Sequence, residues 1–413
     1  MLTAGVDVAS TNVAYHGNMQ NPDTFRFTDA NETIEATTLT LGSGDNFTDG
    51  NDKDKDVLHI ALQNYDVSKA IGASTGQVGN GVTINGIEVL DIDATAGGAN
   101  TITYSGGFTS ITDLIIRGAF DATGNGTGLN VNVSSDSALK TVDLTGVSYA
   151  GGSGLVFTAG TNANDLTISG PSFNASITGG NGNNTITAQG TINGGSGNDV
   201  ITGKGSINGN GGNDTITATG LSTIKGGDGI DTISGYGSIE GGSGDDIITL
   251  TDASTVKGGS GIDTIKTSTN GVVTFEYSSA GETAKLSSDT TDSSAGNIVK
   301  EVVGTATKAD MLTVKVGDKI DISKVSGTGK VVLFRGGEVL DAKTDFTNKI
   351  ADLSSANADV FLLKSGTEYF LVYENSTSVG STDALGSGAE IIKLVGLTDT
   401  NTITLNAGIV TIA

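Results

Sequence analysis

The stretch GGSGDDIITLTDASTVKGGSGIDTIK, residues 241–266, contains the same glycine turn twice, 17 residues apart. In each copy the turn ends in an acidic residue and is followed by a short run rich in Ile and Thr. Self-similarity at a fixed period is typical of architectures in which one structural unit stacks on the next. The repeat therefore bears on the fold more strongly than any single motif.

Six copies of this turn occur along the chain. They begin at residues 179, 194, 209, 226, 241 and 258, so successive turns are separated by 15 or 17 residues. Between them lies a second, shorter unit that consists of a small turn and a β-branched run, as in GKGSIN and LTDASTVK. One period thus contains two strands and two turns, which predicts one coil of a parallel β-solenoid. Neighbouring strands lie about 4.8 Å apart, so six coils would extend roughly 25–30 Å.

Alternation along the strands predicts which side chains face the interior. One interior ladder consists of Ile186, Ile201, Ile216, Ile233, Ile248 and Ile265. The opposite ladder consists of Ile192, Ile207, Ile224, Ile239 and Val256. A slip of one residue would expose both ladders to water, so this register is strongly specified.

Upstream of the glycine turns, a looser repeat of 24–28 residues lacks the acidic turn, as in GIEVLDID and SITDLIIRG. We predict an all-β chain built around a right-handed parallel β-solenoid or β-roll. Its predicted parts are an irregular β region at 1–79, a looser β-solenoid at 80–178, a β-roll with the glycine turns at 179–270 and a mainly β C-terminal domain at 271–413. Two short helices are also predicted, at 64–73 and 345–353.

Composition excludes several classes of protein. With 413 residues and 36% hydrophobic content, the chain can bury a core, and its 63 Gly and 2 Pro favour tight turns. A net charge of −24 argues against nucleic-acid binding, which needs clustered basic residues. An acidic surface suits divalent cations, although a solvated acidic face would have the same composition. The absence of Cys excludes disulfides and thiolate metal sites.

The chain also lacks the sequence features of a membrane span. No apolar run reaches the roughly 18 residues that such a span needs, and the start MLTAGVDVASTNVAYHG has neither the basic start nor the apolar middle of a secretory signal. We therefore expect export without a cleaved N-terminal signal, or a chain that is part of a longer protein.

The turns fit G-G-x-G-x-D-x-U-x, a nonapeptide typical of calcium-binding β-helix repeats. Glycine allows positive φ and close backbone approach, so carbonyl oxygens can point between stacked turns. An aspartate at the sixth position adds a charged ligand, and Ca²⁺ accepts six to eight oxygen ligands in adaptable geometry. Six stacked turns would provide about five Ca²⁺ sites. The alternative is that these are ordinary tight turns, in which Asp bonds the local backbone.

The predicted side-chain ligands are Asp199, Asp214, Asp231, Asp246 and Asp263, with Asn184 at the same position of the first turn. The turn glycines of the predicted sites are Gly179, Gly194, Gly195, Gly197, Gly209, Gly211, Gly212, Gly226, Gly227, Gly229, Gly241, Gly242, Gly244, Gly258, Gly259 and Gly261. The amide of Asn184 is neutral, so we expect the first site to be the weakest.

A second acidic stretch, SGDNFTDGNDKDKDVLHI, contains Asp45, Asp49, Asp52, Asp54 and Asp56. It lacks the central Gly and the closing Glu of an EF-hand loop. The sequence leaves two alternatives open here, a cation site or a solvated charged loop.

The turns over residues 179–266 resemble those of the RTX family of exported Gram-negative proteins. The tail, with GDKIDIS, YFLVYENSTSV and EIIKLVGLTDTNTITL, is also similar to the tails of that family. The resemblance implies a right-handed parallel β-roll and type I secretion directed by an uncleaved C-terminal signal.

Three phrases, LTAGVDVASTN, GSGDNF and NGIEVLDI, resemble RTX-type surface-layer (S-layer) proteins. This resemblance implies a secreted protein of the cell surface whose partners are the type I secretion machinery and further copies of itself in a two-dimensional lattice. Its anchor to the cell surface would lie outside this chain.

Catalytic motifs give no support to an enzyme. The two histidines, His16 and His59, do not form H-E-x-x-H, and the G-x-S-x-G match GASTG has no later His. The glycine turns precede strands, whereas a phosphate cradle precedes a helix. We therefore predict a structural protein; the rival hypotheses are an RTX adhesin and a polysaccharide-modifying exoenzyme.

Overall fold

The computed structural model describes residues 6–7, 13–14, 24–26, 31, 33–37, 45–49, 54–61, 69–71, 83–93, 101–104, 110–120, 129–133, 138–149, 154–267, 271–276, 284–285, 310–313, 319–321, 331–332, 360–365, 368–373, 390–397, 403–406 and 409–412. All regular secondary structure in these residues is β-strand, which confirms the predicted all-β class. The chain divides into two compact units, Met1–Asn210 and Gly211–Ala413. The predicted boundaries at residues 79, 178 and 270 remain predictions.

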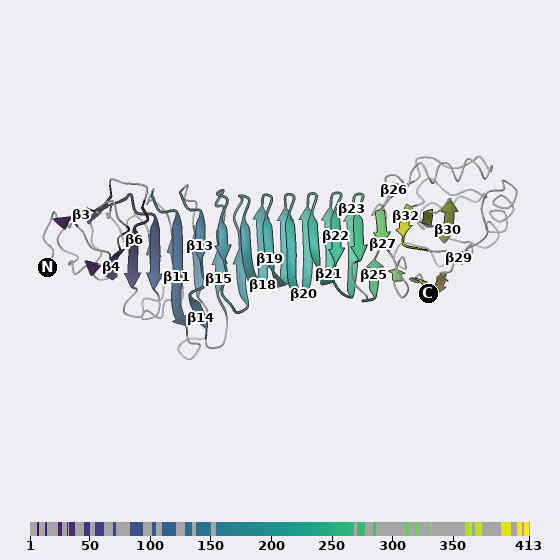
Figure 1. The fold of residues 1–413 in the computed structure, drawn as a ribbon, viewed down its shortest axis with the longest axis horizontal. Helices are drawn as coiled ribbons and strands as arrows, with labels where there is room; N and C mark the ends of the chain where they lie inside the picture. The colour runs from purple at the N-terminus through teal and green to yellow at the C-terminus, as the bar shows by residue number, and fades with distance from the viewer. Residues whose placement is uncertain are drawn as a thin grey trace. The chain divides into compact units, whose positions relative to one another are not determined.

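In the first unit, successive parallel strands form one ladder (Figure 1). Its strands are β4 (Thr33–Thr37), β6 (Val57–Ala61), β9 (Val89–Asp93), β11 (Asp113–Phe120), β13 (Thr141–Asp143), β16 (Thr167–Ser169) and the first half of β18 (Thr185–Ser196). The register aligns Ile34, Leu58, Leu90, Leu114, Val142, Ile168 and Ile186. All of them are at most 1% exposed, so the row is core.

A second parallel ladder of this unit carries the opposite apolar row. It consists of β7 (Lys69–Ile71), β10 (Thr101–Tyr104), β12 (Asn130–Val133), β15 (Val156–Thr158), β17 (Ala175–Thr178) and the second half of β18. Ile102, Val131, Phe157, Ile177 and Ile192 are in register and fully buried. Two rows of apolar side chains therefore form the core of each repeat.

The remaining strands of the first unit lie beside these ladders. A four-stranded sheet consists of β1 (Val6–Asp7), β3 (Thr24–Arg26), β5 (Asn46–Thr48) and β8 (Thr83–Asn85). The others are β2 (Val13–Ala14), paired with β4, β14 (Val147–Tyr149), paired with the end of β11, and β19 (Val200–Gly211).

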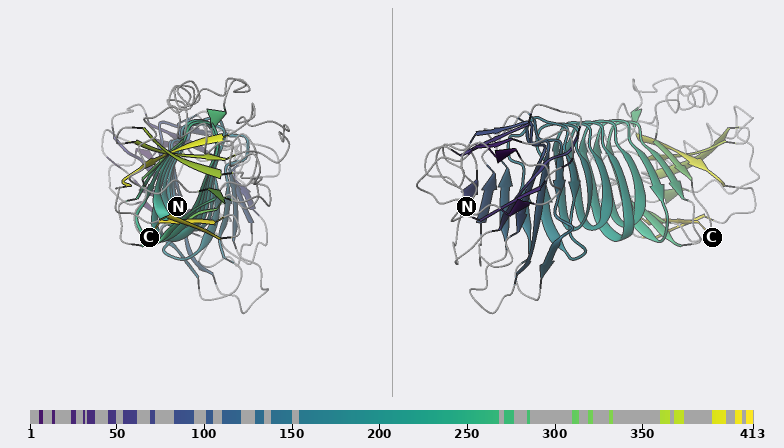
Figure 2. Two further views of the ribbon diagram at one scale, coloured as in Figure 1. Left: turned by 90° about the vertical axis from the view of Figure 1, so that its right-hand side faces the viewer. Right: turned by 60° about the vertical axis from the view of Figure 1, so that its left-hand side comes forward.

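The second unit repeats the two-ladder arrangement with longer strands. β20 (Thr215–Asp228) and β21 (Thr232–Ser243) each contribute to both ladders, and the long strands curve to do so (Figure 2). The first ladder continues through β22 (Ile247–Leu250), β24 (Thr264–Thr267) and β27 (Asp310–Thr313). The second ladder continues through β23 (Ser254–Ser260), β25 (Val273–Glu276) and β28 (Lys319–Asp321).

Toward the C-terminus, pairing becomes mainly antiparallel. β30 (Val360–Ser365), β31 (Glu368–Tyr373) and β32 (Glu390–Val395) pair in sequence order, while β33 (Ile403–Asn406) pairs with β34 (Ile409–Ile412). β26 (Ala284–Lys285) pairs antiparallel with β32, and β29 (Val331–Val332) pairs parallel with β30. The first ladder joins this region because β27 also pairs with β32.

The first of the two 17-residue periods has a structural origin in β20. Its register against β21 shifts by two residues between Thr217 and Leu221. Leu221 is 71% exposed, so the extra residues are accommodated outside the core. Ile216 and Ile224, on either side of the irregularity, remain buried and in register with Ile233 and Ile239. The longer period therefore leaves the interior unchanged.

The predicted interior ladders are confirmed, since every residue of both is at most 2% exposed. The helix predicted at 64–73 is wrong where it can be compared, because Lys69–Ile71 is strand β7 and pairs with β10. In-register pairing with a neighbouring repeat overrides the weak local helical pattern there. The helix predicted at 345–353 lies outside the described residues. Within the described part of the chain, no helix is present that could cross a membrane.

Two neighbouring residues of β22 test the register. Ile248 is fully buried, whereas Ile247 is 41% exposed. We expect Ile248→Ala to lower the free energy of unfolding by about 2–5 kcal/mol, because it leaves a cavity in the core. Ile247→Ala should change it by about 0.5 kcal/mol or less. Urea unfolding monitored by circular dichroism measures both, and equal losses would contradict the register.

Candidate metal centre

The aspartates of the glycine turns occupy one repeated place in the second unit. Each lies immediately before a strand of the first ladder, at what we call the corner position: Asp214, Asp231, Asp246 and Asp263. All four are at most 1% exposed. In the first unit, Asn184 and Asp199 occupy the corner position before β18 and β19 and are each 1% exposed. The turns thus bury their acidic residues.

In four of these aspartates, one carboxylate oxygen accepts a backbone N–H of the neighbouring repeat. The backbone N–H of Asp214 donates to Oδ1 of Asp231 at 2.8 Å, and that of Asp231 donates to Oδ1 of Asp246 at 2.8 Å. Asp246 donates to Oδ1 of Asp263 at 2.9 Å, and in the first unit Asn184 donates to Oδ1 of Asp199 at 2.7 Å. These bonds join residues 15 or 17 apart, so they differ from the local side-chain bonds of an ordinary Asx turn.

The other carboxylate oxygen remains in the interior. Within the described part of the chain, Oδ2 of Asp231 and Oδ2 of Asp246 are buried and have no hydrogen-bond partner. A buried polar atom without a partner is costly, so each such atom in a folded protein requires an explanation. A bound cation is one such explanation.

The first glycine of each turn defines what surrounds this oxygen. A β-carbon on Gly226 would collide with Oδ2 of Asp231 and with the carbonyl oxygen of Gly241. The same relation holds one repeat later, where a β-carbon on Gly241 would meet Oδ2 of Asp246 and the carbonyl oxygen of Gly258. A carboxylate oxygen and a carbonyl oxygen from successive turns therefore lie against the same glycine. Carboxylate and carbonyl oxygens are the ligands that Ca²⁺ prefers.

Close backbone approach between successive turns depends on a second glycine. Gly242 has φ of 126°, and a β-carbon there would collide with the carbonyl oxygen of Gly227. Residues with a β-carbon rarely adopt this φ, so the second glycine of the turn is required by both conformation and space.

The electrostatics of the corner position favour protonation when no cation is present. The pKa of Asp246 is raised to about 7, mainly by burial and to a smaller extent by the carboxylates of Asp263, Asp231 and Asp245, while the hydrogen bond from the backbone N–H of Asp231 opposes the rise. Burial likewise raises the pKa of Asp199 to about 6, and it raises that of Asp231. These groups are therefore poised to hold either a proton or a positive ion.

Sequence reasoning missed a second hydrogen-bonded row, one residue before the corner position. Oδ1 of Asn183 accepts the backbone N–H of Asn198 at 2.7 Å, and Oδ1 of Asn213 accepts that of Ile230 at 2.8 Å. Oδ1 of Asp245 accepts the N–H of Ile262 at 2.8 Å. The signal was present in the dipeptides Asn-Asn, Asn-Asp and Asp-Asp that end several turns. Both residues of such a dipeptide hold adjacent repeats, in opposite directions along the chain.

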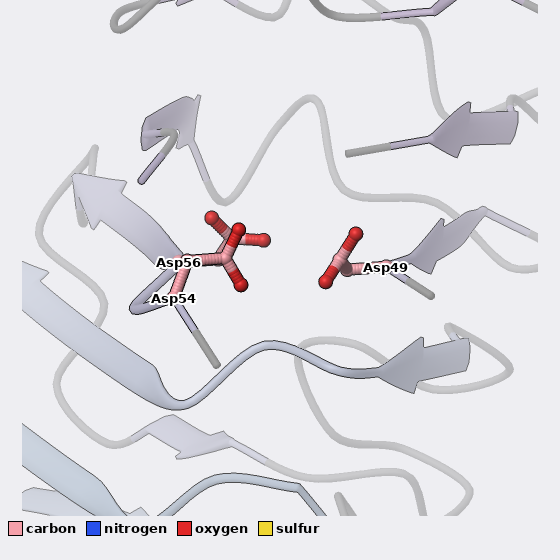
Figure 3. A group of neighbouring side chains, drawn as sticks. All are labelled: Asp49, Asp54 and Asp56. Carbon is pink, nitrogen blue, oxygen red and sulfur yellow. The ribbon is translucent and has the colours of Figure 1, made fainter. Parts of the chain in front are cut away.

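The acidic stretch near the N-terminus forms a second group. Ligand atoms of Asp49, Asp54 and Asp56 all lie within 4.8 Å of one another (Figure 3). Asp45 is fully buried but is not a member of this group. Asp52 lies outside the described residues. The structure thus brings together three of the five acidic residues that the sequence singled out.

Comparison with known proteins adds no assignment. No protein-family model matches the chain, and no curated protein is significantly similar to it.

The raised pKa values predict an unusual pH dependence in the absence of divalent cations. The folded state holds the proton of Asp246 up to about pH 7, whereas its ordinary pKa is 3.8. Stability from this group is therefore complete below about pH 4 and is lost as the pH rises through 7. We expect the chelated protein to have a higher melting temperature at pH 5 than at pH 8. Thermal scans by circular dichroism in EDTA at pH 5 and pH 8 measure this difference in melting temperature.

Asp246→Asn should reduce this pH difference and raise the melting temperature at pH 8, because its amide oxygen can still accept the Asp231 N–H without a charge. Asp252→Asn is the control, since Asp252 is exposed and is not among the groups that shift the pKa of Asp246. An Asp246→Asn protein that loses stability between pH 5 and pH 8 as steeply as the parent would contradict the assignment.

Proposed function

We propose that this chain is a structural, calcium-dependent extracellular protein, whose glycine–aspartate turns bind Ca²⁺ along one edge of a right-handed parallel β-solenoid. The observation that carries the proposal is the buried Oδ2 of Asp231 and of Asp246, which has no hydrogen-bond partner within the described residues and lies against the same glycine as a carbonyl oxygen of the next turn. These residues fit a hard cation that takes oxygen ligands.

The residues that would hold the ions follow from the repeat. Each ion would take the carboxylate of a corner aspartate and carbonyl oxygens of turn glycines, as with Asp231 and Gly241, or Asp246 and Gly258. In the first unit, Asp199 offers the same carboxylate, and its Oδ2 lies against Gly194. Asn184 offers only a neutral amide, whose Nδ2 donates to Oδ1 of Asp199 at 3.1 Å and to the carbonyl of Gly182 at 2.8 Å. The first turn should therefore bind the cation most weakly.

Calcium would make folding of the chain depend on whether it lies in the cytosol or outside the cell. At low cytosolic Ca²⁺, buried carboxylates in adjacent repeats oppose folding and keep the chain competent for secretion. Outside the cell, sites with dissociation constants on the order of 10⁻⁴–10⁻³ M would fill, and binding to the folded state alone would stabilise it by mass action. The RTX-like turns and tail support secretion by a type I machinery.

Calcium removal tests the coupling. We expect EDTA at pH 8 to reduce the β-sheet signal in far-ultraviolet circular dichroism and millimolar Ca²⁺ to restore it. Asp231→Asn combined with Asp246→Asn should raise the Ca²⁺ concentration at half-maximal folding by roughly tenfold, the effect of about 1.4 kcal/mol. Asp252→Asn is the control, because Asp252 is exposed in a turn without the glycine motif. If EDTA changed neither the far-ultraviolet spectrum nor the melting temperature, this proposal would be wrong.

The surface-layer role is a further part of the proposal and is supported by the three S-layer-like phrases in the sequence. We expect the calcium-loaded protein to assemble into ordered two-dimensional sheets, visible by negative-stain electron microscopy. EDTA should disperse them. Monodisperse monomers at high protein concentration in millimolar Ca²⁺ would show that the role is a different one.

A further inference from the structure

The corner position extends through the first unit well beyond the glycine turns. The backbone N–H of Val89 donates to the carbonyl of Asp56 at 3.0 Å, and that of Asp113 donates to the carbonyl of Glu88 at 3.0 Å. The same bond recurs in every later repeat of the unit. Its successive acceptors are Asp56, Glu88, Thr112, Lys140, Leu166 and Asn184. Asp56 is therefore the structural equivalent of the turn aspartates, although no glycine turn precedes it.

Exposure to water at this corner differs between repeats. Lys140 is exposed there and Glu88 is half-buried, whereas Leu166 is only 1% exposed. Asp56 is fully buried at the same position. An ionised carboxylate that is removed from water in this way needs a compensating charge.

Two further carboxylates meet Asp56 at this place. Ligand atoms of Asp49, Asp54 and Asp56 lie within 4.8 Å of one another, and the carboxylates of Asp54 and Asp56 face that of Asp49 (Figure 3). Both carboxylate oxygens of Asp54 are buried and have no hydrogen-bond partner in the described part of the chain. This second observation, independent of the clustering of acids, points to a ligand for Asp54.

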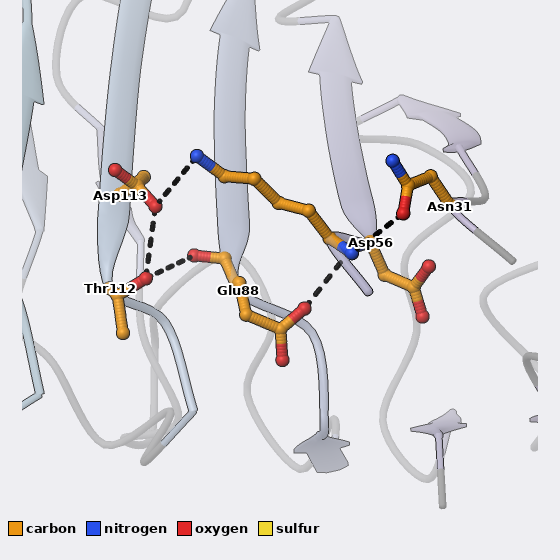
Figure 4. Close-up of polar contacts among 6 residues, drawn as sticks. Asn31, Asp56, Glu88, Thr112 and Asp113 are labelled. Atoms are coloured by element: carbon orange, nitrogen blue, oxygen red, sulfur yellow. Dashed lines mark hydrogen bonds and ion pairs between the residues drawn. The ribbon is translucent and has the colours of Figure 1, made fainter. Parts of the chain in front are cut away.

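The surrounding polar contacts add negative charge to the group. Oε2 of Glu88 accepts the backbone N–H of Asp56 at 3.1 Å, which brings a fourth carboxylate close (Figure 4). The ammonium of Lys55 lies 3.2 Å from Oδ2 of Asp113, and the backbone N–H of Lys55 donates to Oδ1 of Asn31 at 3.0 Å. Burial, together with Asp54 and Asp49, raises the pKa of Glu88.

We propose that Asp49, Asp54 and Asp56 bind a Ca²⁺ ion at a site separate from the glycine turns. Two Ca²⁺–O bonds of about 2.4 Å span about 4.8 Å, so one ion can contact all three carboxylates. Glu88 is a positioning residue, because it holds the backbone of Asp56.

This ion would link two sheets of the first unit. Asp49 follows β5 of the four-stranded sheet, and its backbone N–H donates to the carbonyl of Asn85 at 2.9 Å. Asp56 precedes β6 of the first ladder. Gly86 permits this arrangement, since its φ of 80° is one that residues with a β-carbon rarely adopt, and a β-carbon there would collide with the carbonyl oxygen of Asp49. The ion would therefore join Asp49 and Asp56, the two ends of the segment 49–56, one beside each sheet.

Trypsin provides a direct test, because Lys53 and Lys55 lie within this loop. We expect Ca²⁺ to slow cleavage after both lysines at least tenfold in the full chain, as followed by mass spectrometry. Asp49→Asn combined with Asp54→Asn should abolish this protection and reduce the Ca²⁺ bound per chain by one, as measured by equilibrium dialysis. Asp143→Asn, in the same unit and bonded to Thr145, is the matched control and should leave both results unchanged.

The same assay separates this site from the glycine turns. The double variant of Asp231 and Asp246 should weaken calcium-dependent folding of the second unit but leave protection of the 49–56 loop intact. If the Asp49 and Asp54 variant folds and binds as many Ca²⁺ ions as the parent, the site is wrong. Loop cleavage that is indifferent to Ca²⁺ in the parent would also overturn it. The single variant Asp54→Asn serves if the double variant does not fold.

Discussion

Parallel pairing in register between successive repeats is the constraint on which the rest of the structure depends. It places every residue beside its equivalent in the next repeat, as with Ile216, Ile233, Ile248 and Ile265. For apolar side chains this alignment is favourable, because each row buries itself against the next. Side chains that point outward can also benefit, as Lys225 and Lys257 do by contacting Glu240 from both sides at 3.3 and 3.8 Å.

The same rule is unfavourable for identical buried charges. Two carboxylates about 5 Å apart repel by about 3 kcal/mol at an effective dielectric constant near 20. The corner aspartates reduce part of this cost, because Oδ1 of each accepts a backbone N–H of the neighbouring repeat. The remaining charge requires a proton or a cation, and the raised pKa values of Asp246 and Asp231 express that requirement. Acid and calcium should therefore stabilise the turns as alternatives to each other.

The aspartates of the glycine turns and the group of Asp49, Asp54 and Asp56 both bury carboxylates, but with different local structures. In the glycine turns, missing β-carbons at positions such as Gly226 and Gly241 make room for a carboxylate against a carbonyl. Near the N-terminus, Asp49 and Asp54 lie close to Asp56, which occupies the corner position. In the described repeats between the two groups, the corner buries no charge: Glu88 and Thr112 are half-buried, Lys140 is exposed, and the buried Leu166 is apolar. The corner position thus buries an acid only in the two acidic groups.

The sequence by itself determined the strand class, the period and both interior rows of the repeats, because a two-residue alternation repeated every 15 or 17 residues allows one burial pattern. It also singled out the corner aspartates, since Asp recurs at one position of the turn. It mispredicted residues 69–71, where a local pattern resembled a helix and pairing with β10 prevailed. Only the tertiary structure decided that Oδ1 of Asp231, Asp246 and Asp263 bonds the adjacent repeat, and that Asp56, distant in sequence, is equivalent to Asn184. Such residues are equivalent only because the repeats stack on one another. Where a repeat lacks the glycine turn, its sequence does not show which residue occupies the corner position.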